Sequence, residues 1–298
     1  MFVQENSLKA VKQYFQDRLS DQFDDREIRQ ITKWLVRYRT NVSDTDFMLG
    51  SVKFSESDLL YFKSAKDRLI NGEPIQYILG STWFCDLEFI SDSRALIPRP
   101  ETEELVRWVA ESHDRPLRFA DICAGSGCIA LATKSIRPEW EVLALEIDDD
   151  ALSLIQENMS HLDMEIEVMK FDALSKDIKI EPKVDVIVSN PPYIPPSDKN
   201  SMSTNVLDYE PHLALFVPEE DPLLFYRHLI QNAREMLNDK GWMYFEVHED
   251  LGEDVAQLMR SLTFFNIQLR KDLQGKVRMV AGQLVLSPHG QEFCKDQN

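Results

Sequence analysis

Two segments of the chain combine residue types that could act in one reaction. In the first, Asp121 lies four residues before Gly125 and six before Gly127. Glycines at the start of a helix let the backbone approach a ligand closely, and the helix N-terminus offers unpaired N–H groups. Glu146 follows 19 residues after Gly127, where its carboxylate could hold both hydroxyls of a ribose. This pattern indicates a cofactor that contains a nucleoside.

The glycines alone leave three interpretations open. Together with Glu146 they also satisfy the loose dinucleotide fingerprint of nicotinamide enzymes, and a tight turn without a ligand is the structural alternative. Asp121 favours S-adenosylmethionine, because a carboxylate beneath the ligand would repel a pyrophosphate and attract a sulfonium. Phe171-Asp172 could line an adenine pocket, although a solvent-facing aspartate at a strand end explains Asp172 nearly as well.

The second segment is Ser189-Asn-Pro-Pro-Tyr193. Its two prolines restrict the backbone and contribute carbonyls but no N–H, so the segment favours accepting hydrogen bonds. The Asn190 side-chain carbonyl and the Pro191 main-chain carbonyl can converge on one NH₂ group, and Tyr193 can stack on a planar group. Two such acceptors would turn the lone pair of a conjugated nitrogen towards a methyl donor. The segment therefore indicates methylation of an amide or exocyclic amine without a metal, the structural alternative being a proline turn.

The elements around these segments predict an α/β fold in which both face one crevice. From residue 117 onward, short apolar strands alternate with helices, which is typical of a doubly wound, mostly parallel sheet. Ligands bind such sheets at the carboxyl ends of the strands. The seven predicted strands are 117–122, 141–145, 165–169, 184–189, 241–247, 264–269 and 277–286.

The predicted domains differ in pattern. Residues 1–74 read as a small helical bundle without chemical groups of interest, suited to packing or substrate docking. Within it, Ile28, Ile31, Trp34, Leu35 and Tyr38 recur at helical spacing and predict one buried face. Residues 75–98 predict a β-hairpin linker, and residues 99–298 the catalytic domain.

Charge and cysteine content narrow the function class. The net charge of −18 falls entirely on residues 76–298, because residues 1–75 carry 12 basic and 12 acidic side chains. This disfavours sequence-independent nucleic-acid binding. No run of 18 apolar residues predicts a membrane span, and Met1 to Ala10 lack the pattern of a secretory signal. Cys85, Cys123, Cys128 and Cys294 form no paired zinc motif, so we expect reduced thiols and a cytoplasmic protein.

Around the two segments, the chain resembles the release-factor glutamine methyltransferases, which are class I methyltransferases that modify the Gln of a Gly-Gly-Gln motif. The Asn-Pro-Pro-Tyr motif is shared with adenine N6-methyltransferases, so the flanking sequences discriminate. These are GEPIQYILG at 72–80, LIPRPETE at 96–103, EPxxAL at 210–215 and GxxR at 275–278. The resemblance covers nearly the whole chain and is weakest in the first 70 residues.

The resemblance implies roles for individual residues, S-adenosylmethionine as donor with S-adenosylhomocysteine as product, and N5-methylglutamine in a release factor. It places the cofactor loop on Cys123, Ala124, Gly125, Ser126 and Gly127, the ribose acid on Glu146, the adenine side on Asp172 and Ala173, and the glutamine-binding segment on Asn190, Pro191, Pro192 and Tyr193, with Asn190 also near the cofactor. Two positions depart from the family pattern. Cys123 replaces the usual first glycine, and Glu146 replaces the commoner aspartate.

Two alternatives remain at this point. An N6-adenine methyltransferase acting on DNA or RNA would need a basic surface and a way to present an unstacked base. A non-catalytic S-adenosylmethionine-binding assembly factor is supported only by Cys123. We expect an enzyme that is monomeric, with release factors as partners, no direct nucleic-acid or membrane partner, and no metal.

Overall fold

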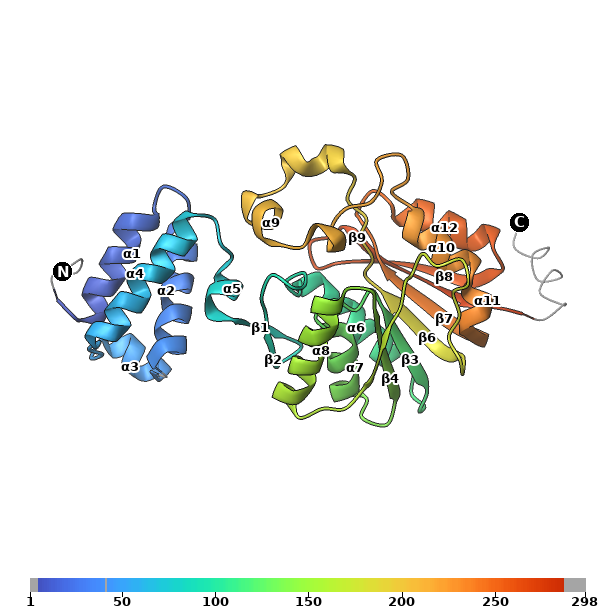
Figure 1. Ribbon diagram of the computed structural model, residues 1–298, viewed down its shortest axis with the longest axis horizontal. Coiled ribbons are helices and arrows are strands. Elements are labelled where there is room, and N and C mark those ends of the chain that lie inside the picture. The colour runs from blue at the N-terminus through green and yellow to red at the C-terminus, as the bar shows by residue number, and fades with distance from the viewer. Residues whose placement is uncertain (1–4, 41, 287–298) are drawn as a thin grey trace. The chain divides into compact units, whose positions relative to one another are not determined.

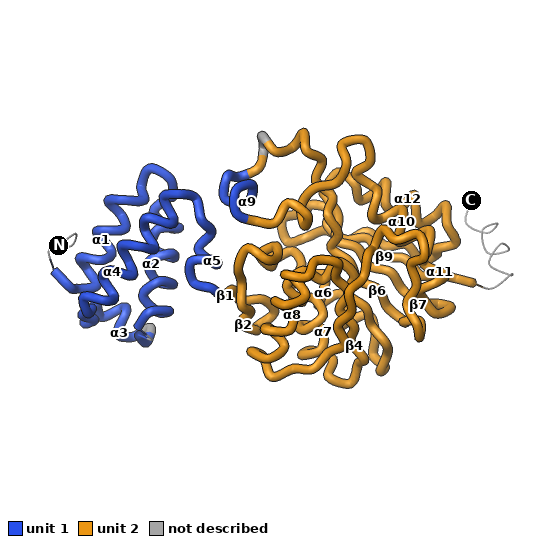
Figure 2. The backbone as a smooth tube through the Cα atoms, viewed as in Figure 1, with its two compact units in different colours: residues 1–80, 203–209 blue, residues 81–202, 210–298 orange. Residues whose placement is uncertain are grey.

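The computed structural model describes residues 5–40 and 42–286. The chain forms two compact units: Met1–Gly80 with Ser203–Tyr209, and Ser81–Met202 with Glu210–Asn298 (Figure 2). We refer to them as unit 1 and unit 2. The predicted division at residues 74 and 98 stays a prediction. Cys294 lies outside the described residues.

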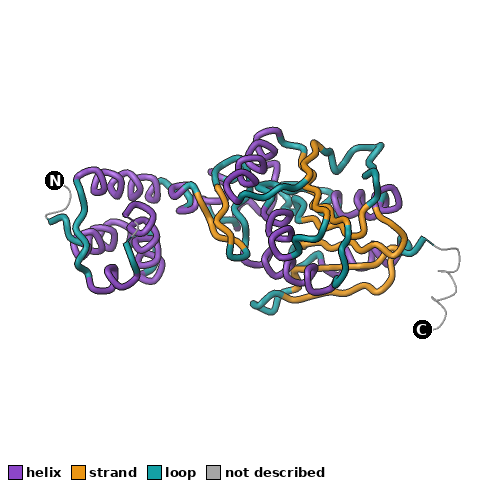
Figure 3. Tube along the Cα trace, turned by 90° about the horizontal axis from the view of Figure 1, so that it is seen from below, coloured by secondary structure: helices purple, strands orange, loops and turns teal. Residues whose placement is uncertain are grey.

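Unit 1 consists of helices joined by loops (Figure 3). Its helices are α1 (Leu8–Leu19), α2 (Asp25–Thr40), α3 (Asp44–Leu49), α4 (Glu56–Ile70), α5 (Ile75–Leu79) and α9 (Thr204–Tyr209). Helix α4 begins with a capping box, in which Ser55 and Asp58 each accept the other's backbone N–H. The Tyr209 hydroxyl donates to the Asn71 carbonyl at 3.0 Å, which ties α9 to the end of α4.

The buried face of α2 differs from the predicted stripe. Ile28, Ile31 and Leu35 are buried as expected, but Trp34 and Tyr38 are 40% and 53% exposed. Thr32 and Val36 occupy the buried face instead, because they follow Ile28 at intervals of four residues, and residues four apart lie on the same side of a helix. The prediction for the two aromatic residues was wrong.

Unit 2 begins with a hairpin of β1 (Ser81–Phe84) and β2 (Leu87–Ile90), paired antiparallel. Cys85 and Asp86 form its two-residue turn with φ of 48° and 64°, as in a type I′ turn. The hairpin lies inside the predicted linker.

The main sheet of unit 2 has seven strands in the order β5-β4-β3-β6-β7-β9-β8 (Figure 1). They are β3 (Arg118–Ile122), β4 (Glu141–Glu146), β5 (Glu167–Lys170), β6 (Val184–Ser189), β7 (Leu237–Glu246), β8 (Phe264–Lys271) and β9 (Val277–Leu284). Strands β3 to β7 pair in parallel, and β9 pairs antiparallel with both β7 and β8. The predicted class I methyltransferase fold with a mostly parallel seven-stranded sheet is confirmed.

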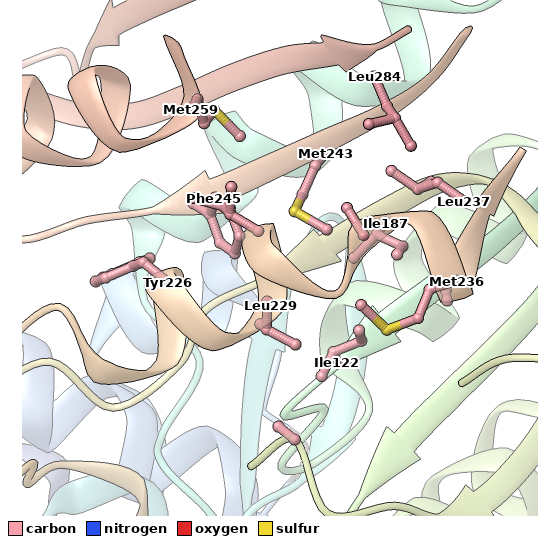
Figure 4. Close-up of a cluster of buried hydrophobic side chains, with 14 of the residues drawn as sticks. Ile122, Ile187, Tyr226, Leu229, Met236, Leu237, Met243, Phe245, Met259 and Leu284 are labelled. Atoms are coloured by element: carbon pink, nitrogen blue, oxygen red, sulfur yellow. The ribbon is translucent and has the colours of Figure 1, made fainter. Parts of the chain in front are cut away.

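Helices cover both faces of this sheet, because successive strand residues point to opposite sides. Met243 and Phe245 of β7 pack in one core cluster with Tyr226 (Figure 4). Tyr244 packs in the other cluster with Trp108. The helices are α6 (Pro100–Ser112), α7 (Cys128–Ile136), α8 (Asp149–Leu162), α10 (Leu224–Gln231), α11 (Ala233–Met236) and α12 (Gly252–Ser261), with 3-10 turns at η1 (Pro196–Ser201) and η2 (His212–Ala214). In the described part of the chain, no helix has the length and apolar character needed to cross a membrane.

The packing of α12 on β9 yields a stability prediction. A Cβ on Gly252 would lie 2.5 Å from Cγ1 of Val277, a β-branched residue with little rotamer freedom. We expect Gly252→Ala to lower the free energy of unfolding by about 1–3 kcal/mol, measured by urea denaturation. Adding Val277→Ala removes the clashing methyl group and should recover part of that loss. Additive effects of the two substitutions would contradict this contact.

Candidate functional site

The carboxyl ends of β3, β4 and β6 border a cavity of about 200 Å³ in unit 2. Of the predicted site residues, its lining contains Cys123, Ala124, Gly125, Ser126, Glu146, Asn190 and Pro192. Those that lie outside the lining are Asp121, Gly127, Asp172, Ala173, Pro191 and Tyr193. Both predicted segments therefore meet at one cavity, as the strand order requires.

The loop after β3 owes its shape to left-handed backbone conformations. Cys123 has a φ of 64°, a conformation that costs an L-residue with a Cβ and that glycine adopts freely. The conformation therefore fits the glycine that the resemblance to the family implies at this position. Gly127 has a φ of 77°, and a Cβ on it would lie 3.2 Å from Ile155. The Asn158 side chain donates to the Ser126 carbonyl at 3.1 Å, which fixes the end of the loop.

Glu146 connects this loop to the chain that follows β4. Its Oε2 accepts from the Gly125 N–H at 2.8 Å, and its Oε1 accepts from the N–H groups of Ile147 and Asp148 at 2.7 and 3.0 Å. The side chain is 8% exposed and lines the cavity. Since a carboxylate offers about four acceptor directions, Glu146 retains capacity to accept from a ligand.

Asp121 lies beneath the loop and is fully buried. Its Oδ2 accepts from the Ala130 N–H at 3.1 Å, whereas no partner contacts its Oδ1. Burial, with the nearby charge of Glu146, raises the pKa of Asp121 to about 8. An unpartnered buried carboxylate oxygen is costly, and positive charge near it would reduce that cost.

The segment after β6 is anchored at its start. The Ser189 hydroxyl donates to the Ile122 carbonyl at 2.6 Å, which ties the end of β6 to the end of β3. Asn190 and Pro192 line the cavity, while Pro191 is buried outside its lining. The Tyr193 ring lies 6.0 Å from that of His248, and burial raises the pKa of its hydroxyl.

The predicted adenine-side residues lie away from the cavity lining. Asp172 is exposed, and its Oδ1 accepts from the Leu174 N–H at 2.8 Å. Ala173 is buried in the hydrophobic core. Ile147 and Asp148, directly after β4, line the cavity instead. The roles of Asp172 and Ala173 stay predictions.

Sequence reasoning missed the wall built by two other segments. Residues 93–99 with Thr102 line the cavity, apart from Ile97, as do Pro211, Leu213 and Ala214. Arg99 pairs with the buried carboxylate of Glu210 at 2.6 Å, and the Ile97 N–H donates to the same carboxylate at 3.1 Å. Residues 96–103 and 210–215 are flanking sequence signatures and were the available signal for this wall, whereas residues 93–95 precede the first signature.

Three of the four cysteines lie among the residues that the structure describes. Cys85, Cys123 and Cys128 are free, and burial raises the pKa of each thiol, that of Cys85 to about 12. A raised pKa disfavours the reactive thiolate. Within residues 5–40 and 42–286, no three His, Cys, Asp or Glu side chains are placed to hold a metal ion.

Comparisons with known proteins agree with this geometry. The family model "Methyltransferase small domain" matches residues 101–208, and "PrmC N-terminal domain" matches residues 10–80. A release factor glutamine methyltransferase of Flavobacterium psychrophilum is 36% identical over 279 residues, covering 92% of this chain and 98% of that protein. Proteins of the same name from Bacteroides thetaiotaomicron and Streptococcus pneumoniae are 34% and 38% identical, covering 92% and 88% of this chain and 99% and 96% of theirs.

These relatives span both units of the chain, and nearly the full length of each relative is matched. The resemblance found in the sequence is thereby confirmed. The chain belongs to the release factor glutamine methyltransferase family.

Proposed function

We propose that this protein transfers a methyl group from S-adenosylmethionine to the side-chain amide nitrogen, N5, of the glutamine in the Gly-Gly-Gln motif of peptide chain release factors. The observation that carries the proposal is the cavity in which the loop after β3, Glu146 and Asn190 converge. The names of the relatives support the choice of substrate. A cytoplasmic location and a monomeric state stay predictions.

The residues around the cavity fit such a cofactor. When bound, S-adenosylmethionine would supply an electrophilic methyl group on its sulfonium sulfur, which leaves as the neutral thioether of S-adenosylhomocysteine. The remaining acceptor capacity of Glu146 suits ribose hydroxyls, and the backbone of residues 123–127 allows close approach. The unpartnered Oδ1 of Asp121 suits the positive charge of the ligand. Asp172 and Ala173 remain the residues proposed to lie on the adenine side of the cofactor.

The segment after β6 is proposed to hold the substrate amide. The Asn190 side-chain oxygen and the Pro191 carbonyl accept hydrogen bonds from the substrate NH₂, while Pro192 and Tyr193 hold the segment in shape. Because an amide lone pair is delocalised and weakly nucleophilic, these acceptors assist by orienting it and by stabilising positive charge as it develops. The nitrogen becomes acidic only as it is alkylated, so a strong base is not needed at the start.

For unit 1 we propose docking of the release factor. Trp34 and Tyr38 of α2 and Met48 and Leu49 of α3 are large apolar side chains that are 40% to 84% exposed. Exposed aromatic and methionine side chains are enriched at protein interfaces. These side chains support the proposal, which is secondary to the catalytic one.

Substrate class is tested by methyl transfer from labelled S-adenosylmethionine. We expect label in an isolated release factor, and mass spectrometry should place the mass of one added CH₂ on the Gln of Gly-Gly-Gln. A release factor with Ala at that position is the matched control and should stay unlabelled. DNA and RNA should also stay unlabelled. Transfer to nucleic acid but not to release factor would support the N6-adenine alternative, and cofactor binding without any transfer would support the assembly factor.

Asn190→Ala should separate methyl transfer from cofactor binding. Because the variant loses one preorganised acceptor, we expect kcat to fall by a factor on the order of 10²–10³. The Kd for S-adenosylhomocysteine, measured by calorimetry, should change little. Asn238→Ala is the control. Asn238 lies near the start of β7, whereas the cavity borders the carboxyl ends of the strands, so this variant should retain wild-type kcat. A rate within about threefold of wild type in Asn190→Ala would contradict the proposed role.

Binding of S-adenosylmethionine should release a proton from Asp121. With a pKa of about 8, this carboxyl is mostly protonated at pH 7, and a nearby positive charge lowers that pKa. Affinity for S-adenosylmethionine should therefore rise as the pH increases towards 8. Calorimetry at pH 7 in two buffers of different ionisation enthalpy measures the released proton. S-adenosylhomocysteine, which lacks the sulfonium charge, should release less, and Asp121→Asn should abolish the difference; equal release for both ligands in the wild type would count against Asp121.

A further inference from the structure

Glu246 is a buried carboxylate directly beside the site that the mechanism above does not use. It ends β7, is 4% exposed and lies outside the cavity lining. Ser189 pairs with Phe245 in the parallel register of β6 and β7. The next residues along these two strands, Asn190 and Glu246, are therefore neighbours.

The partners of Glu246 define how it can act on Asn190. The Thr102 hydroxyl donates to its Oε2 at 2.6 Å, and the neighbouring Asn190 side chain favours the charged form of the same carboxylate, which lowers the pKa of Glu246. The Tyr226 hydroxyl donates to the Glu246 backbone carbonyl at 3.0 Å and fixes the strand end. Because an ionised carboxylate only accepts hydrogen bonds, Asn190 must present its NH₂ group to Glu246. Its carbonyl oxygen Oδ1 is then directed away from Glu246.

We propose that Glu246 is a positioning residue that sets the orientation of the Asn190 carboxamide, so that Oδ1 rather than NH₂ faces the nitrogen to be methylated. This inference rests on the proposed function. The two ends of a carboxamide are nearly equal in size, so packing alone does not select between them. With the amide reversed, the Asn190 NH₂ would face the substrate NH₂, and two donors cannot form a hydrogen bond. A fixed acceptor behind Asn190 removes that unproductive state.

Ionisation of Glu246 decides whether it can fill this role. Its pKa is raised to about 7, chiefly by burial and also by the charge of Glu101 of α6, while Thr102, Arg278 of β9 and the Asn190 side chain act to lower it. The charge of Glu246 in turn contributes to raising the pKa of Tyr193 and of Tyr226. A protonated Glu246 carries an O–H donor and no longer demands the Asn190 NH₂. Methyl transfer should therefore rise with pH through about 7.

Glu246→Gln is the direct test. A glutamine offers one acceptor oxygen for two donors, Thr102 and Asn190, so the selection of one amide orientation is lost. We expect kcat to fall about 10- to 100-fold, the range of other supporting residues, with an unchanged Kd for S-adenosylhomocysteine. The rise of kcat between pH 6 and 8 should disappear. Glu249→Gln is the matched control, because Glu249 pairs with Lys276 at 2.7 Å, and it should retain the wild-type rate and pH profile.

The double variant Asn190→Ala with Glu246→Gln tests whether Glu246 acts through Asn190. Since the orienting effect needs the amide, the second substitution should not lower kcat further. Additive losses would overturn the proposal, and so would a wild-type rate and pH profile in Glu246→Gln. Weaker S-adenosylhomocysteine binding in that variant would assign Glu246 a structural role and overturn it as well.

A readout without turnover separates this inference from the proposed function. The side-chain NH₂ resonances of Asn190, assigned in NMR spectra by their loss in Asn190→Ala, should shift with pH around a midpoint near 7. Glu246→Gln should abolish the shift. If the Asn190 resonances shift with pH in a wild-type protein that methylates no release factor, the proposed function is refuted and the Asn190–Glu246 contact is supported. If they do not shift in an active wild-type protein, only the Asn190–Glu246 contact is refuted.

Discussion

Parallel pairing of four neighbouring strands is the constraint on which the rest of this structure depends. In the order β4-β3-β6-β7, every strand runs in the same direction, so all four end at one edge of the sheet. Asp121, Glu146, Asn190 and Glu246 are 125 residues apart at their extremes in sequence, yet each lies at or near one of these ends. Backbone hydrogen bonds made for stability thus also assemble the polar groups of the site.

The site concentrates acidic groups that would be unfavourable elsewhere. Asp121 and Glu246 are both buried. Burial raises the pKa of Asp121 to about 8 and that of Glu246 to about 7. Burial of a carboxyl group destabilises its charged form, which few natural positions tolerate unless function requires it. Asp121 precedes the proposed cofactor loop, and Glu246 adjoins the segment proposed to bind the substrate amide. This placement is consistent with the proposed cationic donor on one side and an oriented neutral amide on the other.

Much of the sheet and of the candidate site could be predicted from the sequence, because hydrophobic periodicity and glycine spacing reflect local structure. The strands, the loop after Asp121 and the segment after Ser189 were all identified, and the sheet brings them together as expected. What escaped prediction depends on tertiary packing. The Arg99–Glu210 pair and the Thr102–Glu246 hydrogen bond join residues distant in sequence. Trp34 was assigned to the buried face from its helical spacing, but the packing of α2 buries the side that carries Thr32 and Val36.

The Arg99–Glu210 pair also bears on how the protein is made. Its partners are 111 residues apart, and the Thr102–Glu246 contact spans 144 residues. Closing such long chain segments is entropically costly and comes late in folding. During synthesis, Arg99 cannot pair with Glu210, and Thr102 cannot contact Glu246, until residues 210 and 246 have left the ribosome. A nascent chain therefore acquires its complete binding cavity only near the end of translation.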